Sequence, residues 1–235
     1  MTITKAVVFT TVGALVASSL ALTPQQNTRD IQVILVKVVR DVQKKNPARA
    51  WEQAVPTDRL RSGYQLRTDD KSLALLVFPD ESKLIVRSKS IVEIKGQQKD
   101  RGQIVDRSVH VERGRLSFNV KKQESEQFRF SSPISVASIR GTEGGVDHDA
   151  SDTTSTFVCT HGSFDVDGQT VNQGQTYQKH GGENGNVHDS TPNDNSIASQ
   201  DSDDTGDNGG QNGQKNKLEI IGRDASGKEV KIKIE

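Results

Sequence analysis

Cysteine, aromatic residues and net charge are all scarce in this chain of 235 residues. Cys159 is the only cysteine, so the chain forms no internal disulfide and offers no cysteine cluster to a metal. Aromatic residues make up 4% of the sequence, too few for the stacking platforms that bind single-stranded nucleic acids. Nucleophile-elbow, phosphate-loop and dinucleotide-binding motifs are also missing. We therefore expect no enzyme, no cofactor and no nucleic-acid partner.

Hydrophobic residues are also few, at 31% of the chain, but the shortage is local. Between residues 181 and 216 the only apolar side chains are Val187, Ile197 and Ala198, within a stretch rich in Gly, Asn, Asp and Ser. Such a composition buries too little apolar surface to offset the chain entropy lost on folding. We predict an acidic, disordered linker at 181–216, after a domain of normal composition.

The formal net charge is zero because a basic half and an acidic half cancel. Residues 29–122 hold 21 Lys and Arg against 12 Asp and Glu. Residues 123–180 hold 3 against 8, and residues 181–216 hold 1 against 7. A local surplus of positive charge attracts anionic polymers. Anionic envelope glycans and lipid headgroups are therefore candidate ligands of the basic half, and the acidic tail is a candidate ligand in cis.

The first 22 residues have the pattern of an export signal. Lys5 gives a positive start, residues 6–22 are uncharged and mostly apolar, and Ser19-Leu20-Ala21 offers the small residues that signal peptidase reads. A helix of this length spans about 25 Å, which is marginal for a hydrocarbon core of about 30 Å. We predict a signal peptide at 1–22, with an uncleaved N-terminal anchor as the alternative. Both place the remaining chain in the periplasm or cell envelope.

From residue 30 to residue 180 apolar side chains recur with a period of two, which is typical of β-strands. One such run contains Leu73, Leu75 and Val77 on a single face. Turn signals such as Pro79-Asp80 and Ser132-Pro133 separate the runs. We therefore predict an all-β domain at 30–180, with short stacked strands in a β-solenoid-like or sandwich-like arrangement.

Two further segments favour strands. The run from Ile31 to Val42 is β-branched almost throughout, which disfavours a helix and suits a strand buried on both faces. Residues 217–235 hold two apolar runs separated by Asp224-Ala225-Ser226-Gly227, which predicts a C-terminal β-hairpin. A lone hairpin is marginal in water, so we expect its apolar face to dock on another surface.

Three positions are candidates for reactive or metal-binding groups. His148 lies between Asp147 and Asp149, which we interpret as a solvated acidic loop. Residues 201–207 have the alternating acids of a calcium loop, but Asn212 stands where the bidentate Glu is required. We interpret that segment as a soluble spacer, and Cys159 as a small buried hydrophobe. The sequence therefore predicts no catalytic and no metal-binding residue.

Several motifs gain meaning from their order and spacing. Gly114-Arg115-Leu116-Ser117-Phe118 forms a glycine-led strand, and residues 128–133 are followed by Val136-Ala137-Ser138-Ile139-Arg140-Gly141-Thr142. A glycine-containing strand at 161–166 and Gln173-Gly174-Gln175 close the series. Together these motifs resemble the FecR family, whose members include the periplasmic part of iron-dicitrate transmembrane sensors. The resemblance runs from about Val38 to Gln175.

The residues that carry the resemblance most strongly are Gly114, Pro133, Arg140, Gly141 and Thr142. We interpret them as structural. A glycine at position 141 can adopt backbone angles closed to other residues, and Arg140 can form a fork-shaped pair with a carboxylate that fixes layer packing. Ligand contact by Arg140 is the alternative. Glu143-Gly144-Gly145 replaces the aromatic residue that often follows the triplet, so no ligand contact is carried over from the family.

The resemblance implies a role in sensing or transmitting envelope signals. Full regulators of this type also carry a cytoplasmic segment that holds a sigma factor, which we expect this chain to lack. We predict an exported, non-enzymatic FecR-domain protein that acts as a sensing, signalling or protein-interaction module with an envelope protein as partner. The alternative is a protein that binds anionic glycans through its basic half, and a third possibility is a regulator remnant. The membrane takes part only if the N-terminal segment is uncleaved.

Overall fold

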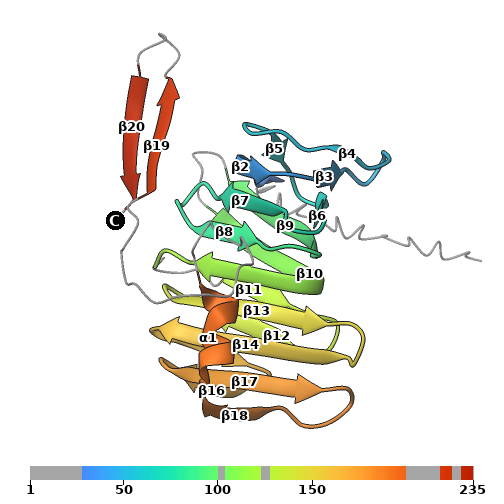
Figure 1. Cartoon of the computed structure of the whole chain (residues 1–235), viewed down its shortest axis with the longest axis vertical. Helices are drawn as coiled ribbons and strands as arrows, with labels where there is room; N and C mark the ends of the chain where they lie inside the picture. The colour runs from blue at the N-terminus through green and yellow to red at the C-terminus, as the bar shows by residue number, and fades with distance from the viewer. Residues whose placement is uncertain (1–27, 100–103, 123–127, 200–217, 224–228, 235) are drawn as a thin grey trace, which may run out of the picture. The chain divides into compact units, whose positions relative to one another are not determined.

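A computed structural model describes residues 28–99, 104–122, 128–199, 218–223 and 229–234 (Figure 1). The chain divides into two units, Met1–Gln200 and Asp201–Glu235. Strands dominate both units, and α1 (Pro192–Ala198) is the one helix within the described ranges. The predicted all-β fold class is confirmed. No helix in the described part of the chain is long and apolar enough to cross a membrane.

Two sheets form the layers of the first unit, and both contain part of the long strand β10 (Ile104–Asn119). The strand order in sheet A is β4 (Glu52–Gln53), β3 (Val42–Lys45), β6 (Gln65–Thr68), β9 (Ile91–Lys99), β10, β11 (Phe128–Ser131), β12 (Val136–Ile139), β15 (Ser163–Val166) and β16 (Gln169–Asn172), with β1 (Thr28–Asp30) also pairing with β9. The order in sheet B is β5 (Arg59–Leu60), β2 (Val33–Val39), β7 (Leu73–Val77), β8 (Lys83–Val86), β10, β13 (Glu143–Asp149), β14 (Thr154–His161), β17 (Gln175–His180) and β18 (Asn186–Asp189).

The chain builds both layers together. After β6 it supplies one or two strands to one sheet and then crosses to the other, so later strands stack onto earlier ones (Figure 1). All pairings between described strands are antiparallel except that of β10 with β11. The stacked, sandwich-like arrangement expected from the alternating pattern is therefore present.

Phenylalanine side chains form the centre of the core between the two sheets. The ring centroids of Phe78 and Phe128 lie 4.8 Å apart, those of Phe128 and Phe130 lie 4.5 Å apart, and those of Phe130 and Phe118 lie 4.7 Å apart. Phe164 continues the series, 6.1 Å from Phe118. Burial of each such ring stabilises the fold by about 1.5–3 kcal/mol. The few aromatic residues of this chain are thus concentrated where the two layers meet.

The burial of two strands differs from what their sequence suggests. In β7, Ala74 and Leu76 belong to the core between the sheets, so Leu73, Leu75 and Val77 face the outer side of sheet B. The prediction that the strand after Ile31 is buried on both faces is wrong, because Ile34 in β2 is 43% exposed. Its alternate residues do enter the core, as a strand with one solvated face requires.

The prediction of disorder is wrong for the first part of the acidic linker. Residues 186–189 form β18, and α1 follows at once. Thr191 caps this helix, because its hydroxyl accepts a hydrogen bond from the Asp194 N–H while the Asp194 carboxylate accepts one from the Thr191 N–H. Pro192 occupies the first turn, where its missing N–H is not needed. Residues 200–216, the rest of the predicted linker, lie outside the described ranges, as does the calcium-like segment.

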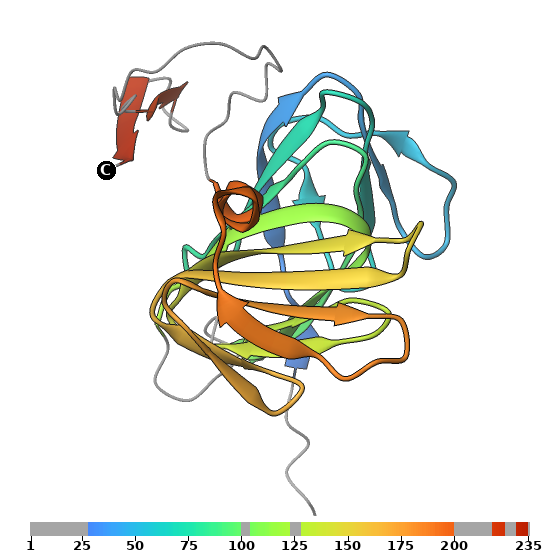
Figure 2. The same ribbon diagram turned by 60° about the horizontal axis from the view of Figure 1, so that its bottom comes forward.

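Sheet B supplies the apolar surface that α1 lacks. Helix α1 lies against this sheet (Figure 2). Ile197 and Ala198 are each 4% exposed and pack on Val158 of β14. The Ser117 hydroxyl donates to the Ile197 carbonyl at 3.0 Å, and a Cβ at Gly145 would lie 2.7 Å from that same oxygen. Composition could not predict this helix, because most of the surface that buries it comes from another part of the chain.

The second unit contains the predicted hairpin. β19 (Leu218–Arg223) pairs antiparallel with β20 (Glu229–Ile234), in a register that places Leu218 opposite Ile234. The turn between the strands and the predicted signal peptide at 1–22 lie outside the described ranges.

Candidate interaction site

Two of the signature glycines lie where the chain passes from one sheet to the other. Gly114 interrupts β10 between its sheet A and sheet B portions, with φ of 85°. Gly141 joins β12 to β13, with φ of 69°. A Cβ would lie 2.7 Å from the Ser90 Cα at Gly114, and 2.7 Å from the Lys122 Cβ at Gly141. Both positions combine a backbone that disfavours side chains with a lack of space, which supports the structural interpretation.

The other three signature residues are spread along the same part of the chain. Thr142 is 2% exposed, and its carbonyl accepts a hydrogen bond from the Val120 N–H at 2.9 Å. Pro133 is exposed in the turn between β11 and β12, and Arg140 is exposed after the end of β12. None of the five signature residues lines the pocket described below. Ligand contact by Arg140 stays a prediction.

A buried ion pair between the layers escaped the sequence analysis. Arg107 of β10 donates a hydrogen bond to the Asp80 carboxylate, and the two side chains are 1% and 4% exposed. The Arg107 guanidinium carbon lies 4.7 Å from the centroid of the Phe128 ring, and the Ser82 hydroxyl donates to Asp80 at 2.6 Å. Arg107 is therefore an arginine that joins the two layers, and the corresponding role expected of Arg140 stays a prediction.

The sequence did contain a signal for this pair. Arg107 is in phase with Val109 and Val111, so the period of two places a cation at a core position. A buried cation requires a carboxylate partner. What the alternation cannot give is the identity of that partner, since Asp80 comes from a turn of the other sheet.

The solvated loop predicted around His148 is wrong, because this segment is strand β13. His148 is 3% exposed, and its Nδ1 lies 2.9 Å from the Ser155 hydroxyl, which donates to Ser132 at 2.7 Å. Asp147 points to the opposite face and pairs with Arg115 at 3.1 Å. Within the described ranges no group of three His, Cys, Asp or Glu side chains could hold a metal ion. The His148–Ser155 pair is enclosed, so it has the surroundings of a structural contact.

Cys159 is fully buried in β14. Burial raises the pKa of its thiol to about 11. At neutral pH the sulfur therefore stays a protonated thiol, which is a poor nucleophile. This state matches the small buried hydrophobe that we expected.

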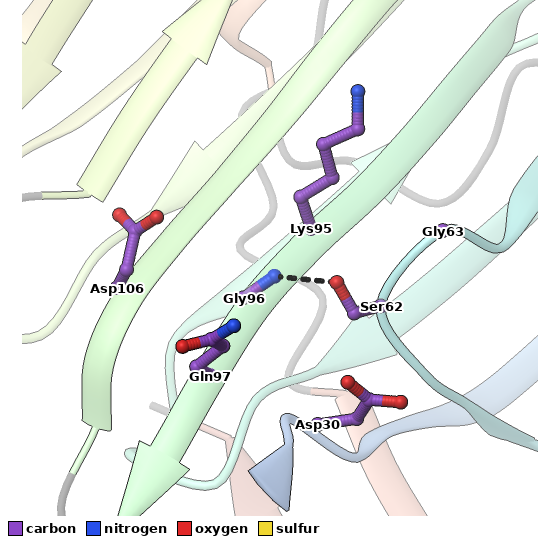
Figure 3. A pocket seen from close by; sticks show the side chains of 7 residues that line it. All are labelled: Asp30, Ser62, Gly63, Lys95, Gly96, Gln97 and Asp106. Atoms are coloured by element: carbon purple, nitrogen blue, oxygen red, sulfur yellow. Dashed lines mark hydrogen bonds between the residues drawn. The ribbon is translucent and has the colours of Figure 1, made fainter. Parts of the chain in front are cut away.

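A polar pocket of about 420 Å³ opens beside β9 in sheet A (Figure 3). Its lining residues come from β1, β9, β10 and the loop before β6, and they are Asp30, Ser62, Gly63, Lys95, Gly96, Gln97 and Asp106. The Gly96 N–H donates to the Ser62 hydroxyl at 3.1 Å, which ties the loop to β9. A Cβ on Gly96 would lie 2.7 Å from the Asp106 carbonyl oxygen, so a glycine is needed for this close approach of β9 and β10.

The charges around the pocket belong to exposed or partly exposed ion pairs. Asp106 pairs with Arg129 at 2.7 Å, and Lys95 pairs with Glu93 at 3.0 Å. These four side chains are 25% to 55% exposed. Exposed ion pairs contribute about 0–1 kcal/mol, so a partner can exchange them for its own charges at little cost. The pocket is suited to recognition of a polar, mixed-charge surface.

The outer face of sheet A continues the polar surface beyond the pocket. Lys95 lies opposite Ser108, and Glu93 lies opposite His110. Burial lowers the pKa of His110, although the carboxylate of Glu93 acts in the other direction. His110 is therefore neutral near pH 7, and its Nδ1 lies 3.0 Å from the Ser131 hydroxyl. These rows of side chains form a flat surface that can contact another protein or a polymer.

Comparison with known proteins confirms the FecR resemblance. The family model described as FecR protein matches residues 64–164, from the start of β6 into β15. The matched region contains all five signature residues and the buried Arg107–Asp80 pair. FecR proteins are regulatory, so the match associates this region with signalling or sensing.

Two crystal structures of a candidate anti-sigma factor from Parabacteroides distasonis ATCC 8503, at 1.65 and 2.50 Å resolution, are similar to part of the chain. Each has a TM-score of 0.46 and 13% sequence identity, and the similarity covers 53% of this chain and 59% of the other. The chain thus spans less than two thirds of the length of those structures. No curated protein matches it.

Proposed function

We propose that the chain is an exported, non-enzymatic FecR-domain protein of the cell envelope, which senses or transmits a signal by binding a protein partner. The FecR match over residues 64–164 carries this proposal. The signal-peptide pattern of residues 1–22 supports export to the periplasm or envelope. The enclosed state of Cys159, His148 and Ser155 supports a function based on surface recognition.

The partner binds at the pocket and at the adjoining outer face of sheet A. This face is polar and carries exchangeable ion pairs, and the rim of a reversible protein interface has the same character. The outer face of sheet B is a poorer candidate around β13 and β14, because α1 already covers it.

Photo-crosslinking in living cells tests this assignment. A photoreactive amino acid replaces Gln97, which is exposed in the pocket, or Gln178, which is exposed on sheet B. We expect one discrete adduct with an envelope protein from position 97 and none from position 178. Equal adducts from both positions, or none from position 97, would contradict the proposed site.

Cell fractionation tests export independently. The mature chain is expected in the periplasmic or envelope fraction, and inhibition of signal peptidase should increase its mass by that of the first 20 or so residues. Recovery of an unprocessed chain in the cytosol would refute the proposed location.

The second candidate function is binding of anionic glycans through residues 29–122. The surplus of Lys and Arg in this region favours it. Retention on an acidic polysaccharide resin that is lost in high salt would support this function, and passage through the resin at low salt would count against it.

A further inference from the structure

A block of four polar side chains and one tryptophan lies on the outer face of sheet A, outside the pocket. Gln43 and Lys45 alternate with buried Val42 along β3, and Gln65 and Arg67 alternate with buried Leu66 and Thr68 along β6. The two strands are neighbours in sheet A (Figure 1). They pair so that Gln43 is opposite Arg67 and Lys45 is opposite Gln65. The block therefore has two cations on one diagonal and two amides on the other.

Trp51 holds the two cations in place. It is half-buried in the segment after β3, with the Arg67 guanidinium carbon 4.5 Å and the Lys45 Nζ 5.8 Å from the centroid of its ring. Gln43 fixes the guanidinium from the side, since its Oε1 accepts hydrogen bonds from Nε of Arg67 at 2.9 Å and from Nη2 at 2.5 Å. A flexible cation loses side-chain entropy when it binds an anion, and these contacts reduce that loss in advance.

The two cations are not neutralised by carboxylates. Lys44, the adjacent residue of β3, lies 2.6 Å from Asp58 and 3.7 Å from Glu52. Lys45 and Arg67 have no ion pair with any described Asp or Glu, although Lys95 and Arg129 on the same sheet face do. Asp58 and Glu52 are thus paired with Lys44, and Glu93 is paired with Lys95, so the block keeps its positive charge.

We propose that Trp51, Lys45 and Arg67 form a binding site for the carboxylates of an acidic polysaccharide. This inference rests on the second candidate function, and it assigns that function to specific residues. Nη1 of Arg67 and the ammonium of Lys45 bind carboxylates, because both are charged donors held about two strand positions apart. Gln65 offers an amide to the sugar hydroxyls, as polar groups do in glycan recognition sites.

A polysaccharide fits the surroundings of this block better than a membrane does. A membrane-binding surface needs protruding apolar side chains beside its cations. Around the block the neighbouring outward residues of β9 are Glu93, opposite Gln65, and Ile91, opposite Arg67. Ile91 and Trp51 are only partly exposed, so the block has no protruding apolar side chain to insert into a bilayer, whereas its two cations suit a single anionic polymer chain.

Fluorescence titration of the full chain tests the site directly, because Trp51 is its only tryptophan. The probe is polygalacturonate, with dextran as the neutral polymer and phosphatidylglycerol vesicles as the membrane control. We expect a saturable change in Trp51 emission with polygalacturonate alone, weakened by raised salt. Loss of one charged hydrogen-bonding partner in Arg67→Gln should reduce the affinity at least about tenfold.

A matched variant separates this site from diffuse charge attraction. Lys121 and Lys122 are exposed in the same basic half, and their joint replacement by Gln removes more charge than Arg67→Gln does. We expect this double variant to bind within about threefold of the parent, because screened distant charges contribute weakly. Equal losses in the two variants, or polymer binding that Arg67→Gln leaves intact, would overturn the site while glycan binding stands. If no form of the protein binds the polymer, both the site and the glycan-binding function are refuted. A response to vesicles alone would show that the block binds membranes.

Discussion

Removal of the Asp80 carboxylate should destabilise the first unit more than removal of any exposed carboxylate. In Asp80→Ala the Arg107 guanidinium, 1% exposed, stays between the layers without this partner, and Ser82 loses the acceptor of its hydroxyl. Breaking a buried ion pair on one side costs about 3–5 kcal/mol. A domain of this size is stable by about 5–15 kcal/mol, so the loss is about a fifth of the total or more.

Urea unfolding followed by Trp51 fluorescence measures this loss. The matched control is Asp70→Ala, which breaks an ion pair of 3.3 Å between side chains that are 62% and 72% exposed. We expect this control to change the free energy of unfolding by about 0–1 kcal/mol. A double variant, Asp80→Ala with Arg107→Met, removes both charges and should recover about 2 kcal/mol relative to Asp80→Ala.

The result that would refute the reasoning is a loss in Asp80→Ala no larger than that in Asp70→Ala. The outcome would show that water reaches Arg107 in the unpaired state. A double variant less stable than Asp80→Ala would instead show that the guanidinium contributes mainly through its contact with Phe128, 4.7 Å away.

Three further predictions follow from the geometry. Gly141→Ala should lower the free energy of unfolding by about 1–2 kcal/mol because of its positive φ, and by a further steric penalty because the new Cβ meets Lys122. The control is Gly174→Ala, with φ of 79° and no atom within 4 Å of the new Cβ, which should show only the first cost in the same unfolding assay. Burial acts to raise the pKa of Asp167, but hydrogen bonds from the Val136 N–H, the Tyr177 hydroxyl and Lys179 lower it overall. The stability it contributes is therefore complete above about pH 3.8, its ordinary value, and is lost as the pH falls through the lower folded pKa. Asp167→Asn should therefore lose more stability at pH 7 than in strong acid. Gly145→Val should displace α1 and speed amide hydrogen exchange of residues 193–198, and unchanged exchange there would disprove the docking on sheet B.

The motifs of the sequence predicted more of this fold than its composition did. The FecR resemblance rested on the order of short segments, and the family match at 64–164 covers most of them. The composition of residues 181–216 suggested disorder, whereas Thr191 and Asp194, with a proline between them, form a capping box. Local hydrogen-bonding motifs such as this one are visible in a sequence and would have located α1.

The candidate sites were harder to predict because they join distant segments. The pocket combines Asp30, Ser62, Lys95 and Asp106, and the block around Trp51 combines β3 with β6. The excess of positive charge in residues 29–122 was visible from the start. Which cations are neutralised by a carboxylate depends on pairings such as that of Lys44 with Asp58, and the register of the strands determines these pairings.

The sequence by itself determined that the chain alternates, turns and stacks as strands, because a period of two is a local property of neighbouring side chains. It also placed glycines at the crossings between layers, since those backbone angles exclude other residues. Only the tertiary structure decided which face of each strand enters the core between the sheets: Ala74 and Leu76 do so in β7, while Leu73 and Leu75 are buried on the other side of sheet B. Alternation of side chains shows that the two faces of a strand differ. The residues that cover one of those faces come from far away in the chain, so alternation does not identify them.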